Sequence, residues 1–443
     1  MIDTSPPGSL LMTIHRLSQG GADRVAILLA NGFAARGIST EVLVLRDGGE
    51  AERTLCGMLH DTVCLTSAGR PMGSYHLELA RGLGTILKRI AASKPTIVLA
   101  SSSNMGLVTG ICARLHHRRR NRPHFFMKLT NPVFRSVDAG PVRRLFRRLL
   151  YNFIFGSYDR ILVLTKEQRD ALINVYPQYQ DRFVTVANPY IGPEALAPYH
   201  REEHRQEAQV LAIGRLMPQK RFDRLLRAFA LVADHQARLT ILGDGPLRPD
   251  LVQLSIQLGI DGRIEMPGFV ECVVPYLHSA DLLVISSDYE GLPAVALEAL
   301  TCDVPVVTTN CFEGARSLLE ALPRCSVVDR CDVPALAAAI DKSLSQRHVA
   351  VQLHAHARPY GFEAAIAAHV AEITSDMPRD CLDVAPDSGG NGVPLGQGAQ
   401  SRRPGQLEVR VDQGSDARGT DVLNDSTPVR GGEQTARCGE TIG

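Results

Sequence analysis

The stretch Asp288–Leu300 reads D-Y-E-G-L-P-A-V-A-L-E-A-L. The apolar run Leu282–Ile285 just before it predicts a buried strand, and the helix formers of Ala294–Leu300 predict a helix. Glu290 is therefore expected on a strand-to-helix loop, and Glu298 is expected in the first turns of the helix. Backbone N–H groups at a helix N-terminus favour a phosphate, whereas carboxylates accept hydrogen bonds from vicinal hydroxyls. A ligand such as a nucleotide sugar carries both groups.

Short apolar strands alternate with helical patterns along most of the chain, which predicts parallel α/β sheets. The expected strands are Leu10–Ile14, Glu41–Leu45, Thr96–Ala100, Phe125–Leu129, Arg160–Leu164, Gln209–Ile213, Arg238–Leu242, Arg263–Met266, Asp281–Ile285 and Val304–Thr308. The expected helices include Ala22–Ala35, Arg221–Ala233, Pro249–Leu258 and Pro334–Leu344. Because ligands bind beyond the carboxyl ends of the strands in such sheets, we expect the site there.

The chain divides at a stretch rich in proline, alanine and charge. Residues 8–188 and 208–375 are expected to form two Rossmann-like, doubly wound domains that face each other across a cleft, with 189–207 as the linker. The last helix of the second domain is expected to pack back on the first. Residues 376–443 are rich in glycine and lack aromatic side chains, so a disordered tail is expected there.

The composition narrows the class of protein. The 443 residues carry a net charge of +1 and ten cysteines with no C-x-x-C pair, which favours reduced thiols in a cytosolic protein. No Cys/His cluster has metal-binding spacing, so no metal site is expected. No apolar run approaches the ~20 residues of a membrane-spanning helix. The protein is therefore expected to be soluble or peripherally attached to a membrane.

Two glycine-containing loops are candidates for phosphate binding. Gly20 and Gly21 follow the first strand and open a helix, whose N-terminus favours an anion. Gly214 ends a later strand, Arg215 follows at once, and Lys220 precedes a helix, so two cations at the sheet edge could clamp a diphosphate. The alternatives are a plain tight turn for the first loop and a solvated basic loop for the second.

Two further turns follow strands of the second half. Asp244, within Gly243–Leu247, could touch a ligand, but such a loop more often only makes the turn, with Pro246 opening a helix. Val270 ends the loop Gly268–Val270, which could line a nucleobase pocket through its backbone.

A basic region lies between Cys112 and Tyr158, where eleven Lys or Arg residues meet a single acid, Asp138. At 100° per residue, one face of the helical stretch Val142–Ile154 is apolar and the opposite face is basic. The apolar face contains Val142, Leu145, Phe146, Leu149, Leu150 and Phe153, and the basic face contains Arg143, Arg144, Arg147 and Arg148. Such a helix favours contact with an anionic membrane surface, the alternative being an ordinary surface helix packed on its own sheet. Nucleic-acid binding is disfavoured, because no aromatic platform accompanies the charge.

Taken in order, these motifs resemble the family 4 glycosyltransferases of the GT-B fold. The matching pieces are G-G-A-D-R near the N-terminus, G-R-x4-K after the linker, G-D-G-P, and E-G-L-P-x4-E-A-L followed by P-V-V. The resemblance covers roughly Leu10–Ile373 and is most specific in the C-terminal half.

The resemblance implies a retaining, metal-independent transfer of a sugar from a nucleotide sugar, expected to be a UDP- or GDP-sugar, with no other cofactor. Arg215 and Lys220 would hold the donor diphosphate and support the leaving group, Glu290 would hold the donor sugar, and Glu298 would bind the ribose. The other implied donor contacts are Gly20, Gly21, Gly214, Asp244, Val270, Gly291, Leu292 and Pro293. Preorganised cations and amides can stabilise a departing nucleoside diphosphate without a metal.

Three positions depart from the family pattern. Asp303 stands where the family often has glycine, and Ser317 stands where a later G-x-x-E element has its acid. Many members also carry a histidine in the N-terminal domain near the donor sugar, whereas this chain reads K-L-T-N-P at Lys128–Pro132. Asn131 and His124 are the two alternatives for that position.

The combined expectation is a cytoplasmic hexosyltransferase, peripheral at the inner face of the cell membrane, that acts on a saccharide or lipid-linked acceptor in surface polysaccharide assembly. A nucleotide-sugar epimerase of the same fold and a catalytically silent nucleotide-sugar-binding partner are the alternatives. An NAD oxidoreductase is disfavoured, because no G-x-G-x-x-G follows a strand.

Overall fold

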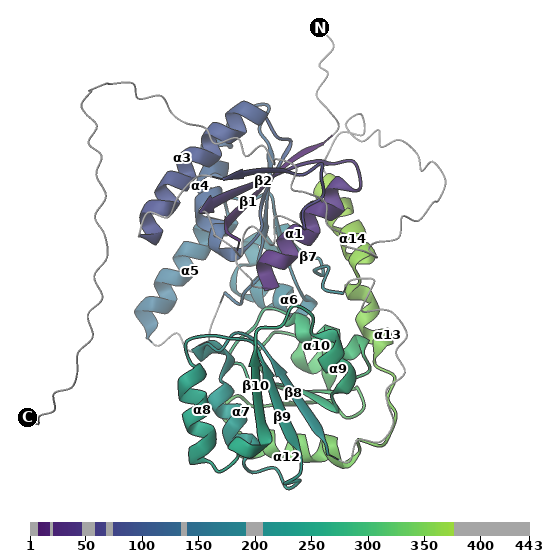
Figure 1. The fold of residues 1–443 in the computed structure, drawn as a ribbon. Coiled ribbons are helices and arrows are strands. Elements are labelled where there is room, and N and C mark those ends of the chain that lie inside the picture. The colour runs from purple at the N-terminus through teal and green to yellow at the C-terminus, as the bar shows by residue number, and fades with distance from the viewer. Residues whose placement is uncertain are drawn as a thin grey trace, which may run out of the picture. The chain divides into compact units, whose positions relative to one another are not determined.

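Two parallel sheets organise the chain (Figure 1). The computed structural model describes residues 8–17, 21–46, 58–67, 74–133, 140–191 and 207–375. The predictions for 376–443 and for most of the linker therefore lie outside the described residues. Among the helices that are described, none is both long and apolar enough to cross a bilayer.

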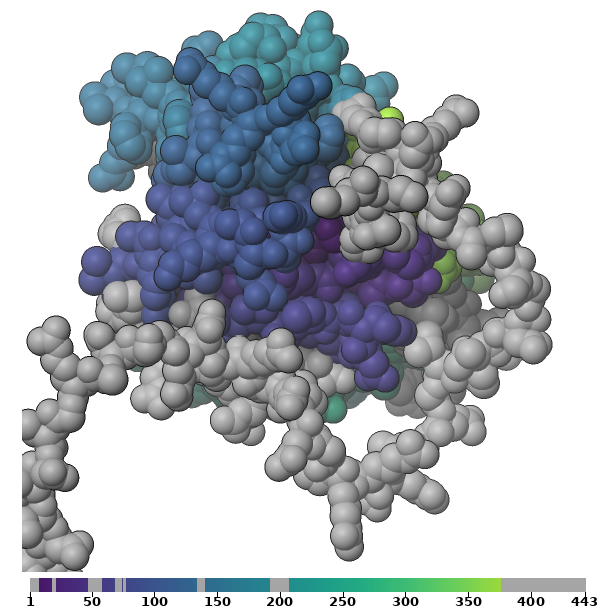
Figure 2. All heavy atoms as spheres, turned by 90° about the horizontal axis from the view of Figure 1, so that it is seen from above, coloured from purple at the N-terminus to yellow at the C-terminus, as the bar shows by residue number. Residues whose placement is uncertain are grey.

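The first sheet has the strand order β3-β2-β1-β4-β5-β6-β7, with neighbouring strands parallel. Its strands are β1 (Ser9–Arg16), β2 (Ser39–Arg46), β3 (Cys64–Ser67), β4 (Ile97–Ala100), β5 (His124–Lys128), β6 (Arg160–Val163) and β7 (Phe183–Thr185). The connecting helices are α1 (Gly21–Ala34), α3 (Tyr75–Ser93), η1 (Ser103–Met105), α4 (Gly106–His116), α5 (Pro141–Phe155), α6 (Lys166–Val175) and η2 (Pro177–Arg182). In Figure 2 the purple segment, which contains β1, α1 and β2, lies directly beside the blue segment, which contains α3 and α4.

The second sheet repeats this plan with the order β10-β9-β8-β11-β12-β13. Its strands are β8 (Gln209–Ile213), β9 (Arg238–Leu242), β10 (Ile264–Gly268), β11 (Leu282–Ile285), β12 (Val306–Thr309) and β13 (Ser326–Val328). Its helices are η4 (Pro218–Lys220), α7 (Phe222–Phe229), α8 (Arg248–Gln257), η5 (Asp261–Arg263), α9 (Val274–Ser279), α10 (Ala294–Thr301), α11 (Ala315–Leu319) and α12 (Val333–Ser345). The chain continues with α13 (His354–Ala357), η6 (Arg358–Tyr360) and α14 (Phe362–Thr374).

Both sheets contain the 3-2-1-4-5-6 order of doubly wound folds, to which the first sheet adds β7, so the predicted α/β class with two Rossmann-like sheets is confirmed. The sequence did not predict β3, β7 and β13. All three are edge strands of three or four residues, and they lack the apolar run that marks a central strand. Helix α7 also ends at Phe229, four residues earlier than the expected Ala233.

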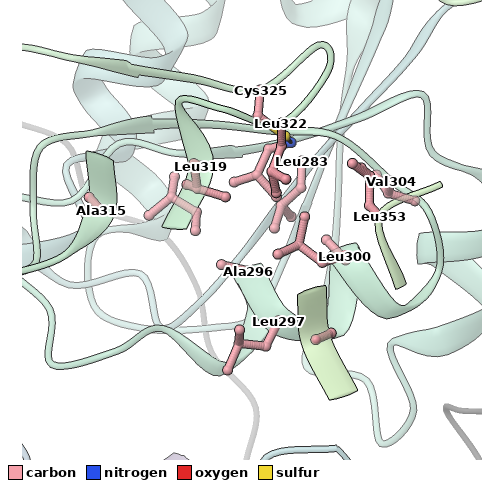
Figure 3. Close-up of a cluster of buried hydrophobic side chains, with 14 of the residues drawn as sticks. Leu283, Ala296, Leu297, Leu300, Val304, Ala315, Leu319, Leu322, Cys325 and Leu353 are labelled. Carbon is pink, nitrogen blue, oxygen red and sulfur yellow. Dashed lines mark hydrogen bonds between the residues drawn. The ribbon is translucent and has the colours of Figure 1, made fainter. Parts of the chain in front are cut away.

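Each sheet separates two apolar layers, because successive strand residues point to opposite faces. In β2, Val42 and Val44 join the cluster beneath α1, whereas Leu43 and Leu45 join the cluster beneath α3 and α4. One layer of the second sheet is drawn in Figure 3, where Leu300 of α10 lies close to Leu283 of β11 and Leu297 belongs to the same buried cluster. This packing fixes α10 and therefore the loop that precedes it.

Helix α14 returns to the first sheet at the end of the described chain. Ile366 and Ile373 belong to the same buried cluster as Met12 of β1 and Phe33 of α1. A Cβ atom on Gly32 would collide with the side chain of Ile366, so α1 and α14 pack closely at that point (Figure 1).

Candidate functional site

The candidate site is built on three loops that leave the carboxyl ends of β8, β11 and β12. The strand order of the second sheet reverses between β8 and β11, which is the switch point where ligands bind in doubly wound sheets. The loops bond one another: Asp288 N–H donates to the Gln219 carbonyl at 2.9 Å, and Glu290 N–H donates to the Cys311 carbonyl at 2.6 Å. The Thr309 hydroxyl also donates to the Ser287 carbonyl at 2.6 Å. The three loops therefore form one hydrogen-bonded unit.

Glu290 and Lys220 form an ion pair at the centre of this unit. Lys220 Nζ lies 2.8 Å from Glu290 Oε1, and the Ser287 hydroxyl donates to the same oxygen at 2.7 Å. Glu290 is 9% exposed, so its carboxylate depends on these two donors. A Cβ on Gly214 would lie 3.0 Å from Lys220 Cε, so a side chain there would crowd the lysine. Gly214 also has φ +158°, at the limit of the range that L side chains seldom adopt.

Arg215 stands apart from the pair. Its side chain is exposed at the sheet edge, and it forms no ion pair with any residue that the structure describes. The two cations predicted to hold a diphosphate are thus in different states: Lys220 is engaged by an acid, whereas the Arg215 guanidinium is available to a ligand.

Glu298 has a different cationic neighbour from Glu290. It lies on α10, and its Oε1 is 3.8 Å from Nη1 of Arg24 on α1. Arg24 belongs to the G-G-A-D-R motif, but only the glycines of that motif entered the sequence prediction. Gly20 lies outside the described residues, and Gly21 begins α1.

The E-G-L-P loop is shaped by its neighbours. Leu292 is 4% exposed and belongs to the core cluster, and Pro293 precedes the first residue of α10 in an extended conformation. A Cβ on Gly291 would collide with the Thr130 carbonyl oxygen and touch Leu164. Glycine at this position is therefore required by close approach to the segment after β5.

Asp244 and Val270 have structural contacts of their own. The Asp244 carboxylate accepts from Gly245 N–H at 2.8 Å, and its carbonyl accepts from Leu216 N–H at 2.9 Å. Asp244 therefore stabilises its own turn. Val270 is half-buried and packs against the core cluster below α10. Donor contacts by either residue stay predictions.

Sequence reasoning missed a supporting layer behind the ion pair. The Arg224 side chain is 4% exposed and donates to Asp288 Oδ1 at 2.6 Å and to the Ser286 carbonyl at 2.8 Å. The Gln219 amide donates to the Tyr289 carbonyl at 2.7 Å. The only available signal was Arg224 itself, a charged residue at a helix position where neighbouring residues predict burial.

One of the departures from the family pattern has a physical explanation in the structure. Asp303 has φ +56°, and its carboxylate accepts from Leu353 N–H at 2.5 Å and from His354 N–H at 3.0 Å. Aspartate tolerates this conformation and here also gains two hydrogen bonds. Ser317 is an exposed residue of α11, and nothing in the structure explains the replacement of the acid.

His124 and Asn131 lie at opposite ends of the same strand region. His124 begins β5, at the amino edge of the sheet, whereas Asn131 follows the carboxyl end of β5. Ligands of such sheets bind at the carboxyl edge, so the position of Asn131 favours it over His124.

The basic helix α5 exposes its apolar residues. Ile154 and Phe155 are buried and Leu150 packs against the same cluster, while five other apolar side chains are open to solvent. Their exposed fractions are 78% for Val142, 58% for Leu145, 69% for Phe146, 60% for Leu149 and 38% for Phe153. Arg143, Arg144 and Arg148 are exposed on the same helix and Arg147 is half-buried.

The two sheets and the loops at β8, β11 and β12 define the GT-B class of fold. The family description "Glycosyl transferases group 1" matches residues 200–361, and "Glycosyltransferase Family 4" matches residues 19–190. The chain belongs to the family 4 glycosyltransferases, as the resemblance of its motifs predicted.

Curated relatives are distant in sequence. An uncharacterized glycosyltransferase of Methanocaldococcus jannaschii is 27% identical over 260 residues, which cover 56% of this chain and 63% of that protein. The amylovoran biosynthesis glycosyltransferase AmsD of Erwinia amylovora is 27% identical over 173 residues, 39% of this chain and 49% of AmsD. The chain thus spans less than two thirds of the length of these two relatives.

One further relative and one solved structure match over greater lengths. An N-acetylgalactosaminyltransferase of Campylobacter jejuni, named for a diphospho-undecaprenol-linked acceptor, is 23% identical over 318 residues, 69% of this chain and 81% of that enzyme. HepE of Anabaena, solved with UDP and glucose, has a TM-score of 0.65 at 19% identity and covers 83% of this chain and 99% of HepE. The likeness to HepE shows the fold.

Proposed function

We propose that this protein transfers a hexose from a nucleoside-diphosphate sugar to a saccharide or lipid-linked acceptor, with retention of configuration at the anomeric carbon. The observation that carries the proposal is the Lys220–Glu290 pair at the switch point, with the exposed Arg215 on the same loop after β8 as Lys220. A diphosphate that binds at this edge would meet the available Arg215 guanidinium. It would also compete with Glu290 for the Lys220 ammonium group. The released Glu290 carboxylate can then accept hydrogen bonds from sugar hydroxyls.

The chemistry follows from this exchange. Departure of a nucleoside diphosphate places negative charge on the leaving oxygen, and preorganised cations stabilise that charge at low reorganisation cost. Arg224, Asp288 and Ser287 hold the loops that carry Glu290 and Lys220, so the pair is fixed before the donor arrives. Glu298 on α10 is proposed to bind the ribose hydroxyls.

The proposed setting is surface polysaccharide assembly on the cytoplasmic side of the cell membrane. The names of AmsD and of the Campylobacter jejuni enzyme connect those relatives to amylovoran and to a diphospho-undecaprenol-linked acceptor. A UDP-sugar is the first donor to test, because HepE was solved with UDP.

Helix α5 is proposed to contact an anionic membrane surface. Five apolar side chains on it are exposed, beside arginines that suit anionic lipid headgroups. Each cation near such a surface contributes ~1 kcal/mol, so four would hold the helix there reversibly. This contact would bring the enzyme to a lipid-linked acceptor.

Donor screening by nucleotide release tests the activity. The protein is incubated with UDP- and GDP-sugars, with and without crude membrane lipid. We expect release from one donor that increases with lipid, and loss of release in Lys220→Ala and in Glu290→Ala with the fold intact by circular dichroism. Arg227→Ala, at an exposed position of α7, is the matched control. Full release in both site variants would refute the site assignment.

The same assay separates the alternative functions. Donor conversion without any acceptor would favour an epimerase, and nucleotide-sugar binding without turnover would favour a silent partner.

Liposome flotation tests the membrane contact. We expect the wild type to bind vesicles with anionic lipid at low salt and to lose binding at high salt. A variant with Arg143, Arg144, Arg147 and Arg148 all changed to Gln should not float. Salt-insensitive or absent binding of the wild type would make α5 an ordinary surface helix.

A further inference from the structure

A second cluster of charge lies at the carboxyl edge of the first sheet, away from the donor loops. His15 and Arg16 end β1, Arg46 ends β2, and Glu78 and Arg81 lie in the first turns of α3. We call these five residues the N-edge cluster. It holds three guanidinium groups and one carboxylate, so it has an excess of positive charge.

Glu78 is the buried member of the cluster. It is 1% exposed, and its carboxylate lies 3.3 Å from His15 Nε2 and 3.6 Å from Arg46 Nη1. A buried carboxylate is costly unless cations or donors face it, and here both partners come from the strand ends. The Glu78 carboxylate therefore holds the side chains of His15 and Arg46 in place.

The partners of Glu78 remain open to solvent on their other side. The Arg46 side chain is 34% exposed and the His15 side chain is 16% exposed. A guanidinium has five N–H donors, so one carboxylate contact leaves most of them for a ligand. Arg81 anchors the same corner, because it donates to the Leu45 carbonyl at 3.1 Å.

The register of the strands places like charges side by side. Arg16 and Arg46 are direct partners in the β1–β2 ladder, and Arg16 is exposed. Like charges at opposed positions are destabilising, and an anion between them would relieve the repulsion. The two neighbouring arginines thus concentrate positive charge at a point where a doubly charged anion would be stabilised.

We propose that the N-edge cluster binds the phosphate or diphosphate group of the acceptor substrate. The cluster lies at the same edge of the first sheet as the segment after β5, where the Thr130 carbonyl contacts Gly291 of the donor loop. This inference rests on the proposed function, because it assigns the acceptor side of the same reaction. Arg16 and Arg46 supply charge-assisted hydrogen bonds, and Glu78 orients the Arg46 guanidinium.

Binding of inorganic pyrophosphate by calorimetry tests the cluster, with the protein saturated with UDP so that the donor loops are occupied. We expect Arg46→Gln and Arg16→Gln each to weaken pyrophosphate binding about tenfold or more, because a charge-assisted hydrogen bond is lost. Arg89→Gln is the matched control, since Arg89 pairs with Glu41 between the same helix and strand but outside the cluster. Equal affinity in all four proteins, or an equal loss in Arg89→Gln, would overturn the proposal.

A transfer assay separates the acceptor site from simple stability. With a phosphorylated acceptor, Arg16→Gln should raise the KM for the acceptor and leave the KM for the donor and the melting temperature unchanged. With a neutral methyl glycoside of the same sugar, the variant should match the wild type. Weaker use of both acceptors alike would refute phosphate recognition. If UDP itself does not bind, the proposed function fails; if UDP binds and pyrophosphate does not, only this inference fails.

Discussion

The two sheets share one strand order but treat charge at their carboxyl edges differently. At the second sheet Lys220 is paired with Glu290 and Arg224 with Asp288, and among the described residues only the exposed Arg215 of these loops' cations lacks an acidic partner. At the first sheet the N-edge cluster has more cations than acids. Topology therefore fixes where a ligand binds, whereas the loops decide what charge it must carry.

Each sheet also has a buried basic side chain near its carboxyl edge, and the two differ in their partners. Arg224 is paired with the carboxylate of Asp288. Lys128, at the end of β5, instead lies 2.6 Å from the imidazole Nε2 of His369 on α14, and both side chains are fully buried. Desolvation lowers the pKa of Lys128 to about 7, and desolvation followed by the charge of Lys128 lowers the pKa of His369 well below its usual value.

The largest predicted effect is the pH dependence caused by Lys128. Between pH 10.5 and about 7 the unfolded chain takes up a proton that the buried amine does not, so the free energy of unfolding falls as the pH is lowered. The loss is on the order of 4 kcal/mol over this window. Lys128→Met should remove most of this slope in urea denaturation measured from pH 7 to 10. An unchanged slope would mean that Lys128 is charged in the folded protein.

The next largest effect is expected for Arg224→Ala. Removing the guanidinium leaves Asp288 and the Ser286 carbonyl without their buried donor, so unfolding should become easier by about 3 kcal/mol. Sugar transfer should fall with it, because the loop that carries Glu290 loses its support. Arg227→Ala on the same helix should change stability by less than about 0.5 kcal/mol. Similar denaturation midpoints for the two variants would contradict the claim that the buried pair of Arg224 and Asp288 supports the edge of the second sheet.

A smaller effect is expected at Asp303, which ends the turn after α10. Asp303→Ala loses the two backbone hydrogen bonds and the contact with His354 Nδ1, and it places alanine at φ +56° without local compensation, for a cost of about 2 kcal/mol. Asp303→Gly keeps the backbone conformation at no steric cost and should lose only about 1 kcal/mol. Thermal denaturation of both variants measures the difference. A more stable alanine variant would show that the conformation carries no strain.

The smallest effect is expected for Arg24→Gln. Arg24 is half exposed and 3.8 Å from Glu298, so solvent screens most of the interaction and stability should change by at most about 0.5 kcal/mol. Arg36→Gln, which breaks the exposed pair with Glu363 on α14, is the control and should behave alike. A much larger loss in Arg24→Gln, measured by urea denaturation, would show that the contact between α1 and α10 is structural.

The sequence was sufficient to predict the fold class because the central strands are apolar runs followed by glycine or charge. It also predicted the loop that holds Glu290 and the loop that holds Lys220, since both follow such runs. It could not predict that these two side chains pair, because 70 residues separate them and nothing local connects them. The pair of Arg224 and Asp288 is hidden for the same reason.

Helix α5 shows another limit of prediction from the periodicity of a sequence. The sequence predicted one apolar face and one basic face, and left open whether the apolar face packs on the sheet. In the structure Ile154 and Phe155 pack there, whereas Val142 and Phe146 remain exposed. A periodic pattern describes which residues share a side of a helix, but not how far along the helix its neighbour extends.

The return of α14 to the first sheet has a consequence for protein synthesis. Lys128 and His369 are 241 residues apart in the chain. At roughly 5–20 residues per second, a ribosome needs on the order of 10–50 s to make the intervening segment. During that time the nascent N-terminal region has its strands but neither Ile366, Ile373 nor the imidazole that faces Lys128. The first domain to be translated is therefore among the last to complete its core, and a chaperone that covers its unfinished face would act on it before the second sheet is finished.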